Sequence, residues 1–432
     1  MVRQLLETQR LAIGAKHMMA AEQDLWRPGV VIGFGWAATR AFMVYAWWVS
    51  SQYIMNDVSY YYTQMANPGQ SALVEYPTPI LWMMRLIYFV TQGNYNSFFS
   101  LVVSLMVVLD ALVTVMLFWR ASTLAAAYWV IFLTLLGPIM WFRIDLIPAT
   151  AVTLGLLLLA TRPRTGGALL AIGAATKIWP ALLILPALGR NPGARRRGIG
   201  FGIVGATLAL LSLLLNGWGR SISPITWQDH RGLQIESLSA TWAMIQHSIK
   251  PDAVHVVYTE YHAYQVTGAG VSSAETVANW LMIGAIVFAI AVALLLAMVP
   301  AIEDDTDAAD RPGFAFAMVL AATATIAAMI AANKTFSPQY LIWMAGPLSL
   351  VLANATTKLQ RGLSITAAVF GCVIAGLTQL IFPLNYNALL ADPGDPKITG
   401  LLVARNLLMA LLTLGLMVWA VRESWHVANR RQ

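Results

Sequence analysis

Acidic residues beside aromatic ones are the first candidates for chemistry in this sequence. Asp57 precedes the run Tyr60–Tyr62, which includes Tyr61, and Glu75 precedes Tyr76-Pro77. A carboxylate flanked by aromatic side chains can act as a general base, because partial removal from water adjusts its pKa. An aspartate in an exposed loop can equally be structural or merely solvated. The sequence therefore offers Asp57 as a candidate general base and Glu75 as a second carboxylate nearby.

Cationic residues form a second group, suited to holding a phosphate. His230 and Arg231 adjoin in a long hydrophilic segment, Lys334 lies in a short polar joint, and Lys177 lies deep in an apolar segment. A charge in an apolar segment costs a few kcal/mol and is functional by default, so Lys177 is expected to face an anion. The alternatives are a surface-packed pair for His230-Arg231 and a snorkelling interfacial side chain for Lys334.

Other charged residues have a structural alternative. Arg143 and Asp145 are two positions apart and are expected to pair with each other at a membrane edge. Arg40, Asp110 and Arg405 lie in or near apolar blocks, where structural ion pairs are one interpretation and a site is the other.

Several kinds of site are excluded. The sequence has no Gly-rich phosphate loop of the P-loop type and no H-E-x-x-H motif, so a nucleotide-driven pump is not expected. Its one cysteine, Cys372, excludes an intrachain disulfide and a cysteine metal cluster.

The elements that carry these residues are expected to be membrane-spanning helices. Of 432 residues, 58% are hydrophobic and 11% charged, against about a quarter charged in globular domains. The apolar residues come in blocks of about 20, the length of a helical crossing. The prediction is an all-α, polytopic bundle with about ten spans. The spans are Val30–Ser50, Phe98–Trp119, Leu124–Phe142, Leu146–Thr161, Ile199–Leu215, Ala278–Val299, Phe314–Ala332, Leu341–Thr356, Ile365–Phe382 and Leu401–Val421.

One apolar segment, Gly167–Leu188, does not fit simple alternation. Arg162 and Arg164 precede it and the cluster Arg195–Arg197 follows, so both of its ends favour the cytoplasm. A re-entrant helix pair that turns around Lys177 is predicted. A full crossing is the alternative, and it would invert the orientation of every span that follows.

The distribution of positive residues predicts the orientation. Alternation from a cytoplasmic N-terminus places most Lys and Arg inside, together with the C-terminus. The net charge of +7 is then explained by anionic lipid head groups, without nucleic acid. Residues 1–432 form one membrane domain, and the outer loops 51–95, 217–276 and 385–398 are expected to form a cap over the active site.

A family resemblance rests on motifs that occur in order along nearly the whole chain. They are Asn56-Asp57 with Tyr60–Tyr62, Glu75–Pro77, Arg143–Pro148, Gly173–Pro180, Arg231–Ser237 and Phe336–Tyr340. In these the chain resembles glycosyltransferase family 87 of the GT-C superfamily. Its best-known members are the polyprenyl-phosphate-mannose-dependent α-mannosyltransferases of actinobacteria. The chain departs from the family where Thr78 follows Tyr76-Pro77 in place of a second proline.

The resemblance implies a GT-C-type bundle in the plasma membrane with an active site on its outer face. A mannosyl residue would pass, with inversion, from polyprenyl-phosphate-mannose to a hydroxyl of a glycolipid or lipoglycan. Asp57 corresponds to the catalytic base of the family, and Glu75 could orient the sugar or replace it as base. No cofactor and no metal are expected. The expected donor-binding residues are Lys177, His230, Arg231, Lys334, Glu75, Glu236, Gln339 and Tyr340, and those expected to support the site are Arg143, Asp145 and Tyr61.

Two alternatives remain at this stage. An arabinofuranosyl- or glucosyltransferase would use the same carrier chemistry, because only the shape of the pocket separates these sugars. A transporter or flippase of a lipid-linked sugar belongs to another class, and many transporters carry internal repeats with paired broken helices. One broken pair and long asymmetric outer loops favour an enzyme. The sequence does not determine the acceptor or the oligomeric state.

Overall fold

The computed structural model describes residues 27–49, 52–67, 72–189, 192–229, 231–250, 252–299 and 312–429. Seven of its helices are long and apolar enough to cross a membrane. They are Arg27–Val49, α4 (Tyr95–Arg120), α8 (Pro192–Asp229), α10 (Val271–Ala297), α11 (Pro312–Ala332), α13 (Lys358–Gln379) and α15 (Pro396–Asn429). The chain is therefore a multi-pass, predominantly helical membrane protein, as its composition predicted.

Three of the ten predicted spans are shorter helices in the structure. α5 (Thr123–Leu136), α6 (Leu146–Leu158) and α12 (Ile342–Asn354) contain 14, 13 and 13 residues. α5 stops at Gly137, whose φ of 82° is a left-handed conformation that favours glycine. The 3-10 helix η2 (Pro138–Trp141) then continues the path. By length and composition, seven of the predicted spans are shown and three are not.

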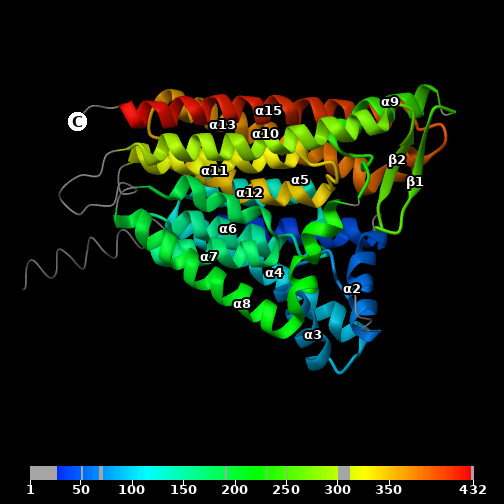
Figure 1. Ribbon diagram of the computed structural model, residues 1–432, viewed down its shortest axis with the longest axis horizontal. Coiled ribbons are helices and arrows are strands. Elements are labelled where there is room, and N and C mark those ends of the chain that lie inside the picture. The colour runs from blue at the N-terminus through cyan, green and yellow to red at the C-terminus, as the bar shows by residue number, and fades with distance from the viewer. Residues whose placement is uncertain are drawn as a thin grey trace, which may run out of the picture.

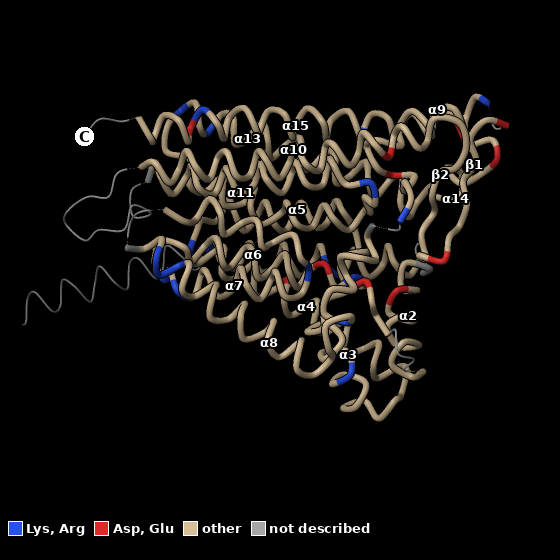
Figure 2. Tube along the Cα trace, viewed as in Figure 1, with Lys and Arg blue, Asp and Glu red and all other residues tan. Residues whose placement is uncertain are grey.

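The helices lie side by side in a bundle whose two ends differ (Figure 1). At one end, termed the capped end, several short elements gather. They are α2 (Asn56–Ala66), α3 (Thr78–Val90), α9 (Thr241–Ile249), α14 (Tyr386–Leu390), β1 (Val254–Tyr258) and β2 (Tyr264–Gly268). The opposite end, termed the basic end, is where Arg164 and Arg196 lie near the beginnings of two helices. Figure 2 shows a group of Lys and Arg segments there, and Asp and Glu segments mainly toward the capped end.

The longest predicted loop contains a β-hairpin that the sequence did not predict. β1 and β2 pair antiparallel, with Val256 opposite Val266. Val254 and Val266 are buried in a second apolar cluster with Leu233 and Ile235. Five-residue strands give only a weak periodic signal, and tertiary packing against this cluster supplies the stability that a lone hairpin lacks.

The chain reverses direction inside the bundle at Lys177. The helix α7 (Pro163–Thr176) ends there, Lys177 takes an extended conformation (φ −154°, ψ 133°), and the 3-10 helix η3 (Trp179–Ala187) follows. A Cβ on Gly167 would overlap the backbone of Arg197, and one on Gly205 would lie 3.8 Å from Ala171. α7 and α8 therefore lie side by side in the same direction, so the chain must return between them through η3. The break coincides with the turn predicted from the sequence.

A buried ion pair joins the first helix to α4 and α5. Arg40 donates to both carboxylate oxygens of Asp110 at 2.7 and 2.8 Å. The indoles of Trp36 and Trp129 donate to the same carboxylate, each at 2.9 Å. Because the pair is enclosed and its carboxylate accepts four hydrogen bonds, it is a structural link between helices.

Candidate functional site

Two ion pairs form the centre of a polar site toward the capped end. Asp57, in the first turn of α2, pairs with Arg143, which lies in the turn between η2 and α6. Asp145 accepts a hydrogen bond from Lys177 Nζ at 2.6 Å. Within the described residues, Arg143 and Asp145 do not form the predicted direct ion pair, although the charge of Asp145 raises the pKa of Arg143. Each has a partner on another element, which joins α2 and the reversal at Lys177 to the beginning of α6.

The carboxylate of Asp145 is enclosed by aromatic side chains. Its Oδ1 also accepts from the indole N–H of Trp343 at 2.8 Å, and Asp145 is only 1% exposed. Lys177 Nζ lies over the rings of Tyr340 and Trp343, 4.4 and 4.8 Å from their centroids. Trp179 stacks on Trp343 with centroids 4.6 Å apart. The anion expected opposite Lys177 is thus, in this structure, a carboxylate of the protein.

The Asp57–Arg143 pair is more accessible than the Asp145–Lys177 pair. The Asp57 side chain is 25% exposed and that of Arg143 is 19% exposed. Burial lowers the pKa of Arg143 to about 10, so it remains a cation at neutral pH. A neighbouring cation favours the ionised form of a carboxylate. Asp57 therefore lies beside a cation and remains partly accessible to a ligand.

Glu75 lies in the turn before α3 and is held from two directions. Tyr60 of α2 donates to its Oε1 at 2.8 Å. Arg220 of α8 donates to the carbonyls of Leu73 and Tyr76 at 2.8 and 3.0 Å, which fixes the backbone on both sides of Glu75. Burial raises the pKa of Glu75, whereas the hydrogen bond from Tyr60 and the charges of Arg220 and Arg231 lower it.

Tyr61 connects α2 to the beginning of α6. Its hydroxyl lies 3.4 Å from that of Tyr76, and the backbone of Ile144 is near enough to lower its pKa slightly. Burial raises the pKa of Tyr61, so the phenol is neutral at neutral pH. Tyr61 thus lies between α2 and the turn that carries Arg143 and Asp145, and its supporting role at the site stays a prediction.

Glu236 is buried behind the site. It is 2% exposed and pairs with Arg405 of α15, which also donates to its backbone carbonyl at 2.8 Å. Burial raises the pKa of Glu236 to about 7, against the opposing effect of the Arg405 charge. The pair fastens the segment after Arg231 to α15, and this is a positioning role for Glu236.

Some buried polar atoms of the site lack a hydrogen-bond partner in the described part of the chain. They include Glu75 Oε2, Gln339 Oε1 and Arg231 Nε. Such atoms cost about 1–3 kcal/mol each unless a ligand or water satisfies them. Arg231 lies near enough to affect the charge on Glu75, and Gln339 adjoins Tyr340 in the 3-10 helix η6 (Pro338–Leu341). These atoms are the best candidates for contacts with a polar ligand.

The structure says less about two predicted site residues, His230 and Lys334. His230 lies outside the described residues. Lys334 joins the site through its backbone, since its carbonyl accepts from the N–H of Gln234 at 2.9 Å. Within the described ranges, no three His, Cys, Asp or Glu side chains come together in a group that could hold a metal ion, and metal independence stays a prediction.

The sequence did not single out Trp343 or Arg220 as site residues. Trp343 bonds Asp145 from 198 positions away, a relation that only the fold creates. Arg220 follows a kink of α8 at Gly217, whose φ is 75°. An arginine soon after a glycine within a long apolar helix was the only signal available for it.

Comparison with protein-family models, with curated proteins and with solved structures finds no match for this chain.

Proposed function

We propose that this protein is a membrane glycosyltransferase of the GT-C type. It transfers a mannosyl residue from polyprenyl-phosphate-mannose to a hydroxyl of a glycolipid or lipoglycan, with inversion. The observation that carries the proposal is a group of residues toward one end of a membrane bundle: an accessible carboxylate, several cations and buried polar atoms that have no partner among the described residues. A lipid-borne donor would reach such a site from the bilayer.

Asp57 is the general base in this mechanism. Its carboxylate takes the proton of the acceptor hydroxyl while that oxygen forms a bond to the anomeric carbon. The bond from the anomeric carbon to the phosphate oxygen breaks on the opposite side, and its electron pair leaves with the phosphate. Arg143 pairs with Asp57 and would hold its carboxylate in position.

The departing phosphate gains negative charge and requires cations. Arg231 is the first candidate, because its buried Nε has no partner in the described part of the chain. Lys177, His230 and Lys334 are further candidates. Lys177 would act while still paired with Asp145. Because Asp145 neutralises much of its charge, Lys177 would contribute mainly as an N–H hydrogen-bond donor.

The sugar itself would be held by the remaining polar atoms. Glu75 Oε2 and Gln339 Oε1 are free acceptors for sugar hydroxyls within the described chain. Tyr340 and Trp343 are buried and stack on each other beside Lys177, with ring centroids 4.3 Å apart, and this stack would border the sugar. Aromatic faces commonly supply the apolar contact in ligand pockets.

The orientation and the full number of spans belong to this proposal. The capped end faces outward from the plasma membrane, and both termini, which lie outside the described residues, are cytoplasmic. α5 with η2 and η6 with α12 complete two further crossings, and α6 a third, to give about ten. The segments 51–95, 217–276 and 385–398 then cover the active site of a single domain.

The test is a donor series with purified full-length protein. Polyprenyl-phosphate-mannose, -arabinofuranose and -glucose are each supplied with a membrane glycolipid extract, and products are identified by mass spectrometry. Mannose transfer supports the proposal. Transfer of another sugar alone would refute the mannose assignment and retain the reaction type, whereas no transfer from any carrier would refute the enzyme.

A further inference from the structure

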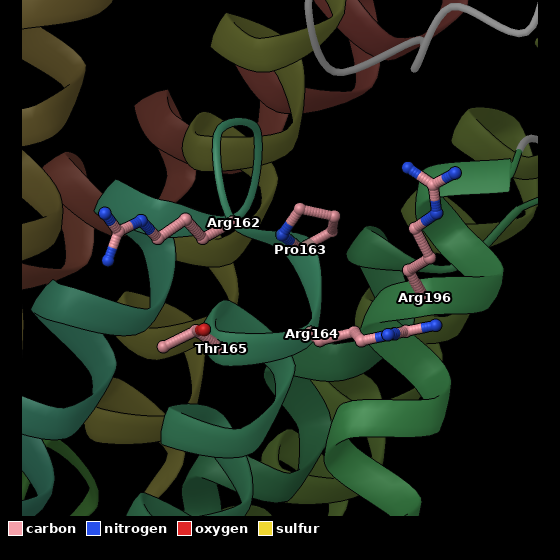
Figure 3. A pocket seen from close by; sticks show the side chains of 5 residues that line it. All are labelled: Arg162, Pro163, Arg164, Thr165 and Arg196. Atoms are coloured by element: carbon pink, nitrogen blue, oxygen red, sulfur yellow. The ribbon is translucent and has the colours of Figure 1, made fainter.

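The basic end contains a cavity that the proposed reaction does not use. Its volume is about 390 Å³, and it is lined by Arg162, Pro163, Arg164, Thr165 and Arg196. Figure 3 shows Arg164 of α7 and Arg196 of α8 extending on the same side of Pro163, while Arg162 extends to the other side. All three arginines are exposed, and none has a carboxylate within ion-pair distance in the described part of the chain.

The chemistry of this cavity favours a phosphate. Neighbouring guanidinium groups repel each other unless an anion lies between them. Guanidinium is planar and donates paired hydrogen bonds that match the oxygens of phosphate. Arg164 and Arg196 come from two helices, so a phosphate between them would link α7 to α8.

An apolar surface continues from the cavity along α8. Ile199, Ile203 and Leu210 follow Arg196 at helical spacing on one face, and they are 38%, 63% and 55% exposed. A ligand with a phosphate at one end and an apolar chain at the other fits this combination. A soluble phosphate would use the arginines alone.

We propose that the cavity binds the phosphate of an anionic phospholipid whose acyl chain lies along this face of α8. The neighbouring Arg197 shows what such binding would reinforce. It is fully buried and donates to the carbonyls of Ala187, at the end of η3, and Leu159, just after α6, at 2.7 and 3.2 Å. A lipid held by Arg164 and Arg196 therefore stabilises the reversal that carries Lys177.

The test measures lipid retention and thermal stability of the purified full-length protein in mild detergent. Phosphatidylglycerol, phosphatidylcholine and millimolar inorganic phosphate are added separately, and bound lipid is counted by native mass spectrometry. The variant is Arg164→Gln with Arg196→Gln. The control is Lys358→Gln with Arg422→Gln, which removes the same charge from exposed positions on α13 and α15.

The expected result is retention of phosphatidylglycerol, with a rise in the unfolding temperature, for the wild type and the control. The variant Arg164→Gln with Arg196→Gln should bind phosphatidylglycerol about tenfold more weakly for each charge-assisted hydrogen bond that the substitutions remove. Equal retention by variant and control would overturn the proposal. So would equal stabilisation by inorganic phosphate and phosphatidylglycerol, because the site would then hold a soluble anion. None of these outcomes depends on glycosyl transfer.

Discussion

Replacing Lys177 with methionine tests the buried ion pair that closes the reversal of the chain. Asp145 is 1% exposed, and its Oδ1 accepts hydrogen bonds from Lys177 at 2.6 Å and Trp343 at 2.8 Å. Lys177→Met leaves the Asp145 carboxylate buried, with the indole of Trp343 as its one remaining hydrogen-bond donor among the described residues. Breaking a buried pair on one side costs about 3–5 kcal/mol. At about 2 °C per kcal/mol, the unfolding temperature should fall by roughly 5–10 °C.

The double variant Lys177→Met with Asp145→Asn makes this test decisive. It removes both charges, so it should be more stable than Lys177→Met alone. Unfolding is followed by tryptophan fluorescence in detergent, with the exposed Lys250→Met as the matched control. Destabilisation of the double variant equal to the sum of the two single variants would refute the coupling, because residues in one ion pair must not behave additively.

Three further predictions follow from other contacts. Burial raises the pKa of Glu236 from 4.5 to about 7. Between these values the folded state binds a proton that the unfolded state has lost, so the free energy of unfolding should decline as the pH rises from about 5 to 7. Glu236→Gln should remove this decline, which is worth at most about 3 kcal/mol, in thermal unfolding from pH 5 to 8, and an unchanged pH dependence in the variant would contradict the raised pKa of Glu236. Tyr60→Phe removes a hydrogen bond that lowers the pKa of Glu75, so the acid limb of a transfer-rate profile should move to higher pH if ionised Glu75 is required; an unmoved limb would exclude that role. Asp110→Asn leaves Arg40 without its carboxylate inside the bundle and should cost about 3 kcal/mol or more in unfolding, and a change below about 1 kcal/mol would show that this pair is not a structural link.

The sequence was most informative where one physical effect dominates. Long continuous apolar blocks predicted the seven helices of crossing length, because barrel strands would give short alternating segments instead. Arginines at both ends of one apolar segment predicted the break at Lys177, since both ends then favour the same side of the membrane. The lengths of α5 and α12 were overestimated because an apolar run does not reveal where a 3-10 helix replaces the α-helix, and that of α6 because its last apolar residues form a turn.

The site was harder to predict, since its contacts join distant parts of the chain. Arg143 and Asp145 are close in sequence, which suggested a pair. In the structure Arg143 pairs with Asp57 of α2, and Asp145 pairs with Lys177 at the end of α7. The role of Trp343 depends on α12 lying beside α6. The β-hairpin escaped notice because its strands are only five residues long.

The role of Asp57 is the central claim, and one rate comparison tests it most directly. The initial rate of mannose transfer is measured for the wild type, for Asp57→Asn and for Asp252→Asn, an exposed aspartate on the capped end as control. Loss of a general base lowers the rate by about 10²–10⁴-fold, so Asp57→Asn should fall by at least 100-fold while the control stays near wild type. A folded Asp57→Asn protein that transfers mannose at a rate within a few-fold of wild type would contradict Asp57 as the base.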